Sequence, residues 1–309
     1  MNVRYIEITK EEDGQRLDNY LIRILKGVPK SHIYRIIRGG EVRVNKKRAA
    51  VSSRLVMGDM VRIPPVRISA DKDIHVGTKL SELLVKSIIH EDNNLLVINK
   101  PAGIAVHGGS GLSLGIIEAM RNIRTDLSYL ELVHRLDKDT SGCLLLAKKR
   151  SMLRSIQALL EARLVNKTYW ALLCNPWHGK KAITIDVALV KNTLKSGERV
   201  VRVSEDGKKS QTLFKLLENY KETCLVEASP KTGRTHQIRV HSASFCHPIV
   251  GDEKYGGNEL TFENIVTKNR LYLHARAIQF NLNGIDYKFQ ADLDEKFAET
   301  LIHLRATGS

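Results

Sequence analysis

Positive charge is concentrated at one end of this 309-residue chain, and this constrains its organisation more than any other feature. Residues 1–68 contain 15 Lys and Arg against 7 Asp and Glu, a net charge of +8, whereas the whole chain carries +15. More than half of the excess therefore lies on less than a quarter of the chain. Because neutralising phosphates releases condensed counterions, such a surplus indicates a polyanionic partner. We expect a basic binding module joined to a second domain; a merely basic surface is the simpler alternative.

Apolar periodicity predicts two short helices followed by a hairpin in this basic segment. An i, i+3, i+4, i+7 stripe begins at Leu17, and a second helix follows Ser31, which is the expected N-cap. Short strands are expected over residues 41–45 and 60–63, with a turn at Asn45-Lys46 after the first of them. The segment therefore has the elements of a small, independently folded unit.

Composition excludes several classes of protein. The chain is 42% hydrophobic, enough for a sizeable core, yet it has no run of 18 apolar residues that would span a membrane. The first residues lack the apolar core of a signal peptide. Four cysteines are scattered without a C-x-x-C pair, which favours a reducing cytosol over a disulfide framework or zinc site. We expect a cytoplasmic protein.

The remainder of the chain predicts a linker and a larger domain. Pro64-Pro65 and the polar stretch after it break both periodicities, so we expect a first domain over 1–68, a linker over 69–85 and a second domain over 86–309. A hairpin is predicted at the start of the second domain, around residues 88–98. The glycine-rich stretch 108–111 precedes a helix predicted from Leu114 to Arg121. Because it lacks the Lys-Ser/Thr ending of a P-loop, a flexible loop is favoured over a nucleotide site.

The most informative acidic segment is Asp137–Gly142, which reads D-x-D-x-S-G. It opens like an EF-hand loop, but the twelfth position is Lys148 instead of a bidentate Glu, which makes calcium binding improbable. In an ordinary Asx turn, Asp137 or Asp139 would only cap backbone amides. The residues alone leave this interpretation and a catalytic carboxylate equally open.

Two later segments bear on that choice. Lys167–Leu172 has the pattern of a strand, with Tyr169 available to face a cleft. Gly233–His241 concentrates two arginines and two histidines; Thr235 could cap a helix there, although the alternation would also suit a strand, and we favour the helix. The two histidines lie five residues apart without a third ligand at a zinc spacing, so we interpret them as hydrogen-bonding residues.

Taken in order, these motifs resemble the RluA-type family of pseudouridine synthases. The matching segments are His134–Gly142, Lys167–Tyr169 and Thr232–His241, together with Lys100–Gly103 and His247–Asp252. The N-terminal segment resembles an S4-type RNA-binding domain, and Lys26–Ser31 with Val106–Gly111 narrow the resemblance to members that act on 23S rRNA. The resemblance implies an α+β fold, with a small S4-like domain and a catalytic domain built on a mixed, mostly antiparallel sheet flanked by helices and loops.

The resemblance also implies roles for individual residues. Asp137 would be the nucleophile and Arg239 its ion-pair partner. Tyr169 would stack on the uracil and help to remove its C5 proton, Arg135 would fill the space left by the flipped nucleotide, and Ile238 would pack against the base. The further implied contacts are His134 and Arg234 in the substrate site, and Lys30, Arg35, Arg38, Lys46, Lys47 and Arg48 on RNA phosphates.

The implied reaction breaks an N-glycosidic bond and rejoins the uracil through C5, so we expect no redox cofactor, metal or ATP. The expected partner is the 23S rRNA of the large-subunit precursor, bound by a monomer, with no nucleotide cofactor and no membrane. A non-catalytic S4-type rRNA-binding or ribosome-assembly protein is the main alternative. A carboxylate-pair glycosidase is weaker, because Asp137 and Asp139 lie only two residues apart in one loop.

Overall fold

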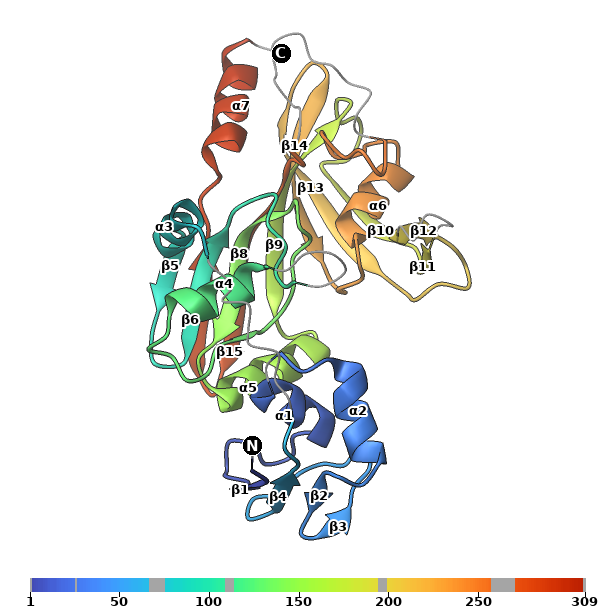
Figure 1. Cartoon of the computed structure of the whole chain (residues 1–309). Coiled ribbons are helices and arrows are strands. Elements are labelled where there is room, and N and C mark those ends of the chain that lie inside the picture. The colour runs from blue at the N-terminus through green and yellow to red at the C-terminus, as the bar shows by residue number, and fades with distance from the viewer. Residues whose placement is uncertain are drawn as a thin grey trace. The chain divides into compact units, whose positions relative to one another are not determined.

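The computed structural model describes residues 2–25, 27–66, 76–108, 114–193, 199–256 and 270–307. Lys26, most of the glycine-rich loop and much of the predicted linker lie outside these ranges. The chain forms two compact units, Met1–His75 and Val76–Ser309, which are described separately (Figure 1). Within the described ranges, no helix is both long enough and apolar enough to cross a membrane.

The first unit packs two helices on a small sheet. The buried apolar stripe of α1 (Leu17–Ile24) meets that of α2 (Lys30–Arg38), and Leu17, Leu21 and Ile33 are fully buried between them and the sheet. The sheet is antiparallel in the order β1-β4-β2-β3. Its strands are β1 (Arg4–Glu7), β2 (Arg43–Val44), β3 (Lys47–Arg48) and β4 (Met60–Ile63).

The predicted helices and the predicted hairpin turn are present in this unit, with one error at a helix start. Asn45 and Lys46 both have positive φ, of 50° and 67°, which is the backbone of a tight two-residue hairpin turn. The N-cap prediction was wrong: α2 begins at Lys30 after Pro29, and no side chain caps it. Pro29 is the N-cap residue, with a φ of −57°, so the helix begins two residues earlier than an N-cap at Ser31 would predict.

The second unit is built on a ten-stranded sheet. Its main path is β10-β13-β14-β9-β15-β8-β6-β5, with β16 beside β15 and β7 beside β8. Every pair is antiparallel except β15 with β8, so the fold is α+β with a mixed, mostly antiparallel sheet, as predicted. The strands are β5 (Ile88–Glu91), β6 (Leu95–Lys100), β7 (Glu131–Leu132), β8 (Ser141–Ala147), β9 (Asn166–Cys174), β10 (Ala182–Asp186), β13 (Gln211–Asn219), β14 (Thr223–Pro230), β15 (Leu273–Leu282) and β16 (Ile285–Gln290), while β11 (Leu189–Thr193) and β12 (Arg199–Val203) form a separate pair.

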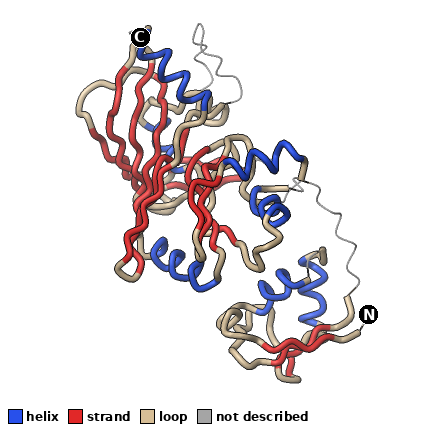
Figure 2. The backbone as a smooth tube through the Cα atoms, turned by 90° about the vertical axis from the view of Figure 1, so that its left-hand side faces the viewer, coloured by secondary structure: helices blue, strands red, loops and turns tan. Residues whose placement is uncertain are grey.

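Within the described residues, five helices accompany this sheet. The strands occupy the middle of the second unit and the helices lie outside them (Figures 1 and 2). The helices are α3 (Thr78–Lys86), α4 (Ile116–Ile123), α5 (Arg150–Glu161), α6 (Gln237–Ser244) and α7 (Glu295–Ala306). The structure differs from the predicted linker over 69–85, because α3 occupies its end and Leu84 is fully buried in the second unit. Burial of a short apolar face decided this helix, which the polar composition had concealed.

One glycine sets the register of the central strands. Gly142 has φ +108°, and a Cβ on it would lie 2.3 Å from the carbonyl oxygen of Ala275. No side chain fits there, so β8 and β15 approach closely at this point. Ala275 pairs with Gly142 on one side and with Tyr169 of β9 on the other. The start of β8 and the middle of β9 are therefore held in one row across three strands.

Candidate active site

Asp137 lies in the loop between β7 and β8, just before β8 begins. Its backbone carbonyl, not its carboxylate, accepts the N–H of Thr140 at 3.2 Å and closes the turn. The carboxylate is 32% exposed and faces Arg239 Nη1 at 3.9 Å and His236 Nε2 at 3.8 Å. It lines a cavity of about 860 Å³. This geometry favours a carboxylate available for chemistry over one that caps a turn.

Arg239 is held by a second acid that the motif analysis did not assign. Its Nε and Nη2 donate to the carboxylate of Asp252 at 2.8 and 2.7 Å, and the Asp252 side chain is 0% exposed. Asp252 also accepts the backbone N–H groups of Lys254 and Tyr255. The bidentate pair fixes the plane of the guanidinium, so Nη1 of Arg239 is held in one orientation toward Asp137.

His236 and Tyr255 complete the wall beside the acid. His236 begins the turn into α6 in the left-handed region, with φ 51°, and no side chain caps that helix, so the proposed Thr235 cap is wrong. The predicted helix itself is present. His236 Nδ1 and the Tyr255 hydroxyl lie 2.7 Å apart, and the Arg239 guanidinium stands 5.1 Å from the centre of the Tyr255 ring. Burial lowers the pKa of His236, and the charge of Asp137 opposes the shift.

Two buried cations hold the loop that carries Asp137. Lys100 is 0% exposed, and its ammonium donates to the carbonyls of Pro101, Ile104 and Lys138 at 2.7–2.8 Å. Burial lowers the pKa of Lys100 to about 7, while Asp139 opposes the shift. Arg270 donates to the carbonyl of Asp139 at 3.3 Å. The two residues that follow Asp137 are therefore both tied to the rest of the unit through their backbone carbonyls.

Tyr169 lies close to the acid but is largely covered. It is half-buried on β9 and packs against two apolar clusters. Burial raises the pKa of the Tyr169 phenol, and the charge of Asp137 raises it further. The hydroxyl therefore stays protonated at neutral pH, so that it can donate or accept a hydrogen bond but does not carry charge.

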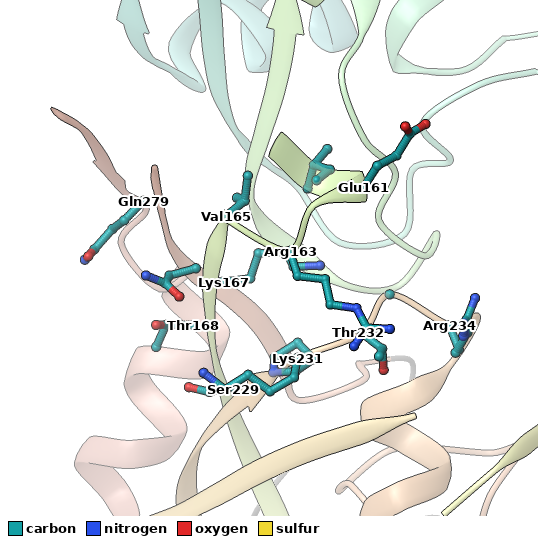
Figure 3. Close-up of a pocket in the computed structure, with 14 residues that line it drawn as sticks. Glu161, Arg163, Val165, Lys167, Thr168, Ser229, Lys231, Thr232, Arg234 and Gln279 are labelled. Atoms are coloured by element: carbon teal, nitrogen blue, oxygen red, sulfur yellow. The ribbon is translucent and has the colours of Figure 1, made fainter. Parts of the chain in front are cut away.

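The other predicted substrate residues are distributed unevenly. Arg135 is exposed and lines the Asp137 cavity. Arg234 is exposed beside a different cavity (Figure 3), and Ile238 is 6% exposed within an apolar cluster. His134 turns toward the sheet, where its Nε2 accepts the N–H of Leu145 at 3.2 Å. Accepting that bond requires an unprotonated nitrogen, and burial lowers the pKa of His134 to about 4. His134 is thus placed to brace the Asp137 loop.

The predicted RNA contacts share one property. All six side chains are exposed on the first unit, on α2 and on the hairpin of β2 and β3. They are Lys30, Arg35, Arg38, Lys46, Lys47 and Arg48. Within the described ranges, no group of three or more His, Cys, Asp or Glu side chains forms a cluster able to hold a metal ion.

Sequence analysis did not identify the residues that hold Arg239 and the Asp137 loop in place. Asp252 and Lys100 both lie in segments that matched the family, His247–Asp252 and Lys100–Gly103, but neither residue was given a role. A charged residue can be recognised as buried from the sequence only when the segments around it are predicted to be apolar. The apolar run over residues 95–98, which ends two residues before Lys100, was the available signal.

The chain thus joins a unit with an exposed basic face to a domain in which a buried acid holds an arginine beside a second, partly exposed acid. Residues 15–61 match the S4 domain, residues 94–244 match the RNA pseudouridylate synthase family, and this chain belongs to that family. It is 50% identical to the ribosomal large subunit pseudouridine synthase C of Haemophilus influenzae, over 98% of this chain and 96% of the relative. The Escherichia coli K12 protein of the same name is 49% identical, over 98% and 97%. The solved structure of human RNA pseudouridylate synthase domain containing 4 has a TM-score of 0.62 at 31% identity, covering 74% of this chain and 96% of that one.

Proposed function

We propose that this chain isomerises uridines of large-subunit rRNA to pseudouridine, with Asp137 as the nucleophile. The observation that carries the proposal is the carboxylate of Asp137 at the cavity wall, 3.9 Å from an arginine that Asp252 holds in place. At this distance the guanidinium attracts the carboxylate and limits the directions in which it can point. Curated relatives about half identical to this chain carry the name of that activity.

The chemistry needs one ionised acid and a displaced base. The N-glycosidic bond breaks, the uracil turns, and a C–C bond forms from C5 to the ribose, while the C5 proton leaves to solvent and N1, freed from the ribose, takes up a proton. Asp137 would add to C6 of the uracil or act at the ribose during glycal formation; both routes use the same carboxylate. Neither route adds or removes electrons or atoms overall, so the proposed reaction needs no added co-reactant.

The target nucleotide must leave its helix to reach the cavity. A stacked base does not expose the atoms that react, so the enzyme has to extrude the nucleotide. Arg135 is exposed at the cavity and is proposed to occupy the vacated space, while Tyr169 and Ile238 are proposed to contact the base. Further proposals are that the protein acts as a cytoplasmic monomer and that its substrate is the 23S rRNA of the large-subunit precursor.

Release of tritium from RNA labelled at uridine C5 tests the activity directly. We expect the wild-type chain to release label from 23S rRNA, and Asp137→Asn to release none while binding RNA within a few-fold of wild type. Mutating an acid to its amide keeps the volume and removes the charge. Substantial turnover by Asp137→Asn would refute the nucleophile. RNA binding without any release by the wild type would indicate a binding-only S4 protein.

The basic unit is tested through the salt dependence of binding. Each phosphate contact contributes about 0.7 to 0.9 to the slope of log K against log salt. Changing Arg35, Arg38 and Lys47 to Gln should therefore flatten the slope by about two to three units. All three side chains are exposed, so these changes should preserve the fold of the unit. An unchanged slope would show that these side chains do not contact the RNA backbone.

A further inference from the structure

A second cavity of the catalytic unit carries four basic residues, of which only Arg234 was predicted to contact the substrate. Its volume is about 540 Å³, and it lies among the end of α5, the start of β9 and the loop that joins β14 to α6 (Figure 3). Four cationic side chains line it: Arg163, Lys167, Lys231 and Arg234. Glu161 is the single acid among the lining residues. This excess of cations in a hollow indicates an anionic ligand.

Lys167 is the innermost of these cations. It is half-buried, and burial lowers the pKa of its amine. Within the described part of the chain, no carboxylate and no hydrogen-bond acceptor offsets that cost. A Cβ on Gly233 would lie 3.6 Å from Nζ of Lys167, so the ammonium lies directly beside the loop that carries Lys231 and Arg234. A desolvated ammonium without a partner is a binding group for an anion that arrives from outside.

Arg163 reaches the cavity at a conformational cost. It follows the C-cap of α5 and has φ +60°, a position where helices usually place glycine. In Figure 3 its side chain extends toward the loop that carries Lys231 and Thr232. Left-handed backbone at a bulky residue disfavours the folded state and is concentrated at functional sites. The positive φ of Arg163 therefore indicates that the arginine is present for its function and not for the stability of the fold.

The facing loop is rigid because one buried glutamine uses its whole amide. Gln237 is 4% exposed; its oxygen accepts from the hydroxyl of Thr232 at 2.6 Å and the N–H of Arg234 at 3.0 Å. Its nitrogen donates to the carbonyl of Gln211 and the hydroxyl of Thr212, both at 2.9 Å. The loop that carries Lys231 and Arg234 is thus set in place before any ligand binds, which lowers the ordering cost of binding.

We propose that this cavity is a phosphate subsite for the substrate RNA, next to the nucleotide that enters the Asp137 cavity. The inference rests on the proposed function. Lys167 and Tyr169 are two residues apart on β9, so they share one face of the strand about 7 Å apart. Tyr169 lies beside Asp137, so the phosphate next to the target nucleotide along the RNA would reach Lys167. Backbone contacts of this kind position the RNA without reading its sequence.

Two variants separate binding from folding. Lys167→Met removes the ammonium and keeps the length of the side chain, and Arg163→Gly removes the guanidinium and relieves the positive φ. Both should leave the thermal midpoint unchanged or raise it. Lys221→Ala is the matched control, because this exposed lysine precedes β14, at the end of the strand opposite Lys231.

Tritium release from an rRNA fragment gives kcat and KM, and filter binding over a salt series gives the slope. For each of the two variants we expect KM to rise about tenfold with kcat within about twofold. The slope should fall by about 0.7. Lys221→Ala should match wild type. Unchanged KM and slope in both variants would overturn the proposal, as would a fall in thermal midpoint that accounts for the loss. If the wild type binds RNA but releases no tritium, the proposed function fails, and the binding slopes still decide the subsite.

Discussion

Asp252→Asn tests the ion pair that orients Arg239 without changing a residue that is proposed to touch RNA. The Asp252 carboxylate accepts two N–H groups of Arg239 and two backbone N–H groups, with its side chain 0% exposed. An amide has one acceptor oxygen, so in either orientation its NH₂ faces a donor of Arg239. At least one charge-assisted hydrogen bond is lost, at about 1.5–3 kcal/mol. With the new donor–donor contact, the free energy of unfolding should fall by about 3 kcal/mol.

The same change should affect turnover. Without the ion pair to Asp252, the guanidinium of Arg239 would move toward the carboxylate of Asp137, which lies 3.9 Å away in the wild-type structure. A displacement of about 1 Å in a catalytic group costs on the order of 100-fold in rate. We therefore expect kcat to fall about 100-fold, measured by single-turnover tritium release at saturating RNA and at a temperature where the variant remains folded.

A second Arg–Asp pair provides the control. Arg16 donates to Asp18 at 2.7 and 3.1 Å, and the Asp18 side chain is 3% exposed, but the pair lies in the first unit. Asp18→Asn should lower stability without lowering kcat at saturating RNA. The reasoning is refuted if Asp252→Asn keeps kcat within about threefold of wild type, because the orientation of Arg239 would then be irrelevant to the reaction.

The remaining predictions concern two groups behind the Asp137 loop. The pKa of His134 is about 4 in the folded chain and about 6.5 when unfolded, so the unfolded state binds more protons between these values. The contribution of neutral His134 to the free energy of unfolding is complete above pH 6.5, and about 3 kcal/mol of it is lost as the pH falls to 4. Urea midpoints measured over this pH range should show the loss. In His134→Gln the midpoint should depend less steeply on pH. Lys100→Met leaves three carbonyls without a donor and should lower the urea-derived stability by about 3 kcal/mol or more. An unchanged midpoint would contradict that role.

Local patterns were enough for α1, α2 and α6 and for the motif residues, but not for α3. The stripe from Leu17 predicted α1, and the alternation around Lys167 predicted β9, because periodicity records which side of an element is buried. The prediction failed at element ends. Ser31 and Thr235 have the chemistry of caps, yet α2 and α6 begin without them. Cap geometry depends on how the preceding chain enters the helix, and the residue type alone does not record that.

The sequence by itself determined that a basic S4-like segment precedes a domain carrying Asp137, Tyr169 and Arg239, because charge, spacing and motif order are properties of the chain. Only the tertiary structure decided what each group faces. Asp252 lies 13 residues from Arg239, and Lys100 lies 38 residues from the carbonyl of Lys138. Such pairs form when strands distant in sequence become neighbours, as at Gly142, where close approach to Ala275 sets the register. Buried charges select their partners by proximity in a low-dielectric interior, and only the folded chain establishes that proximity.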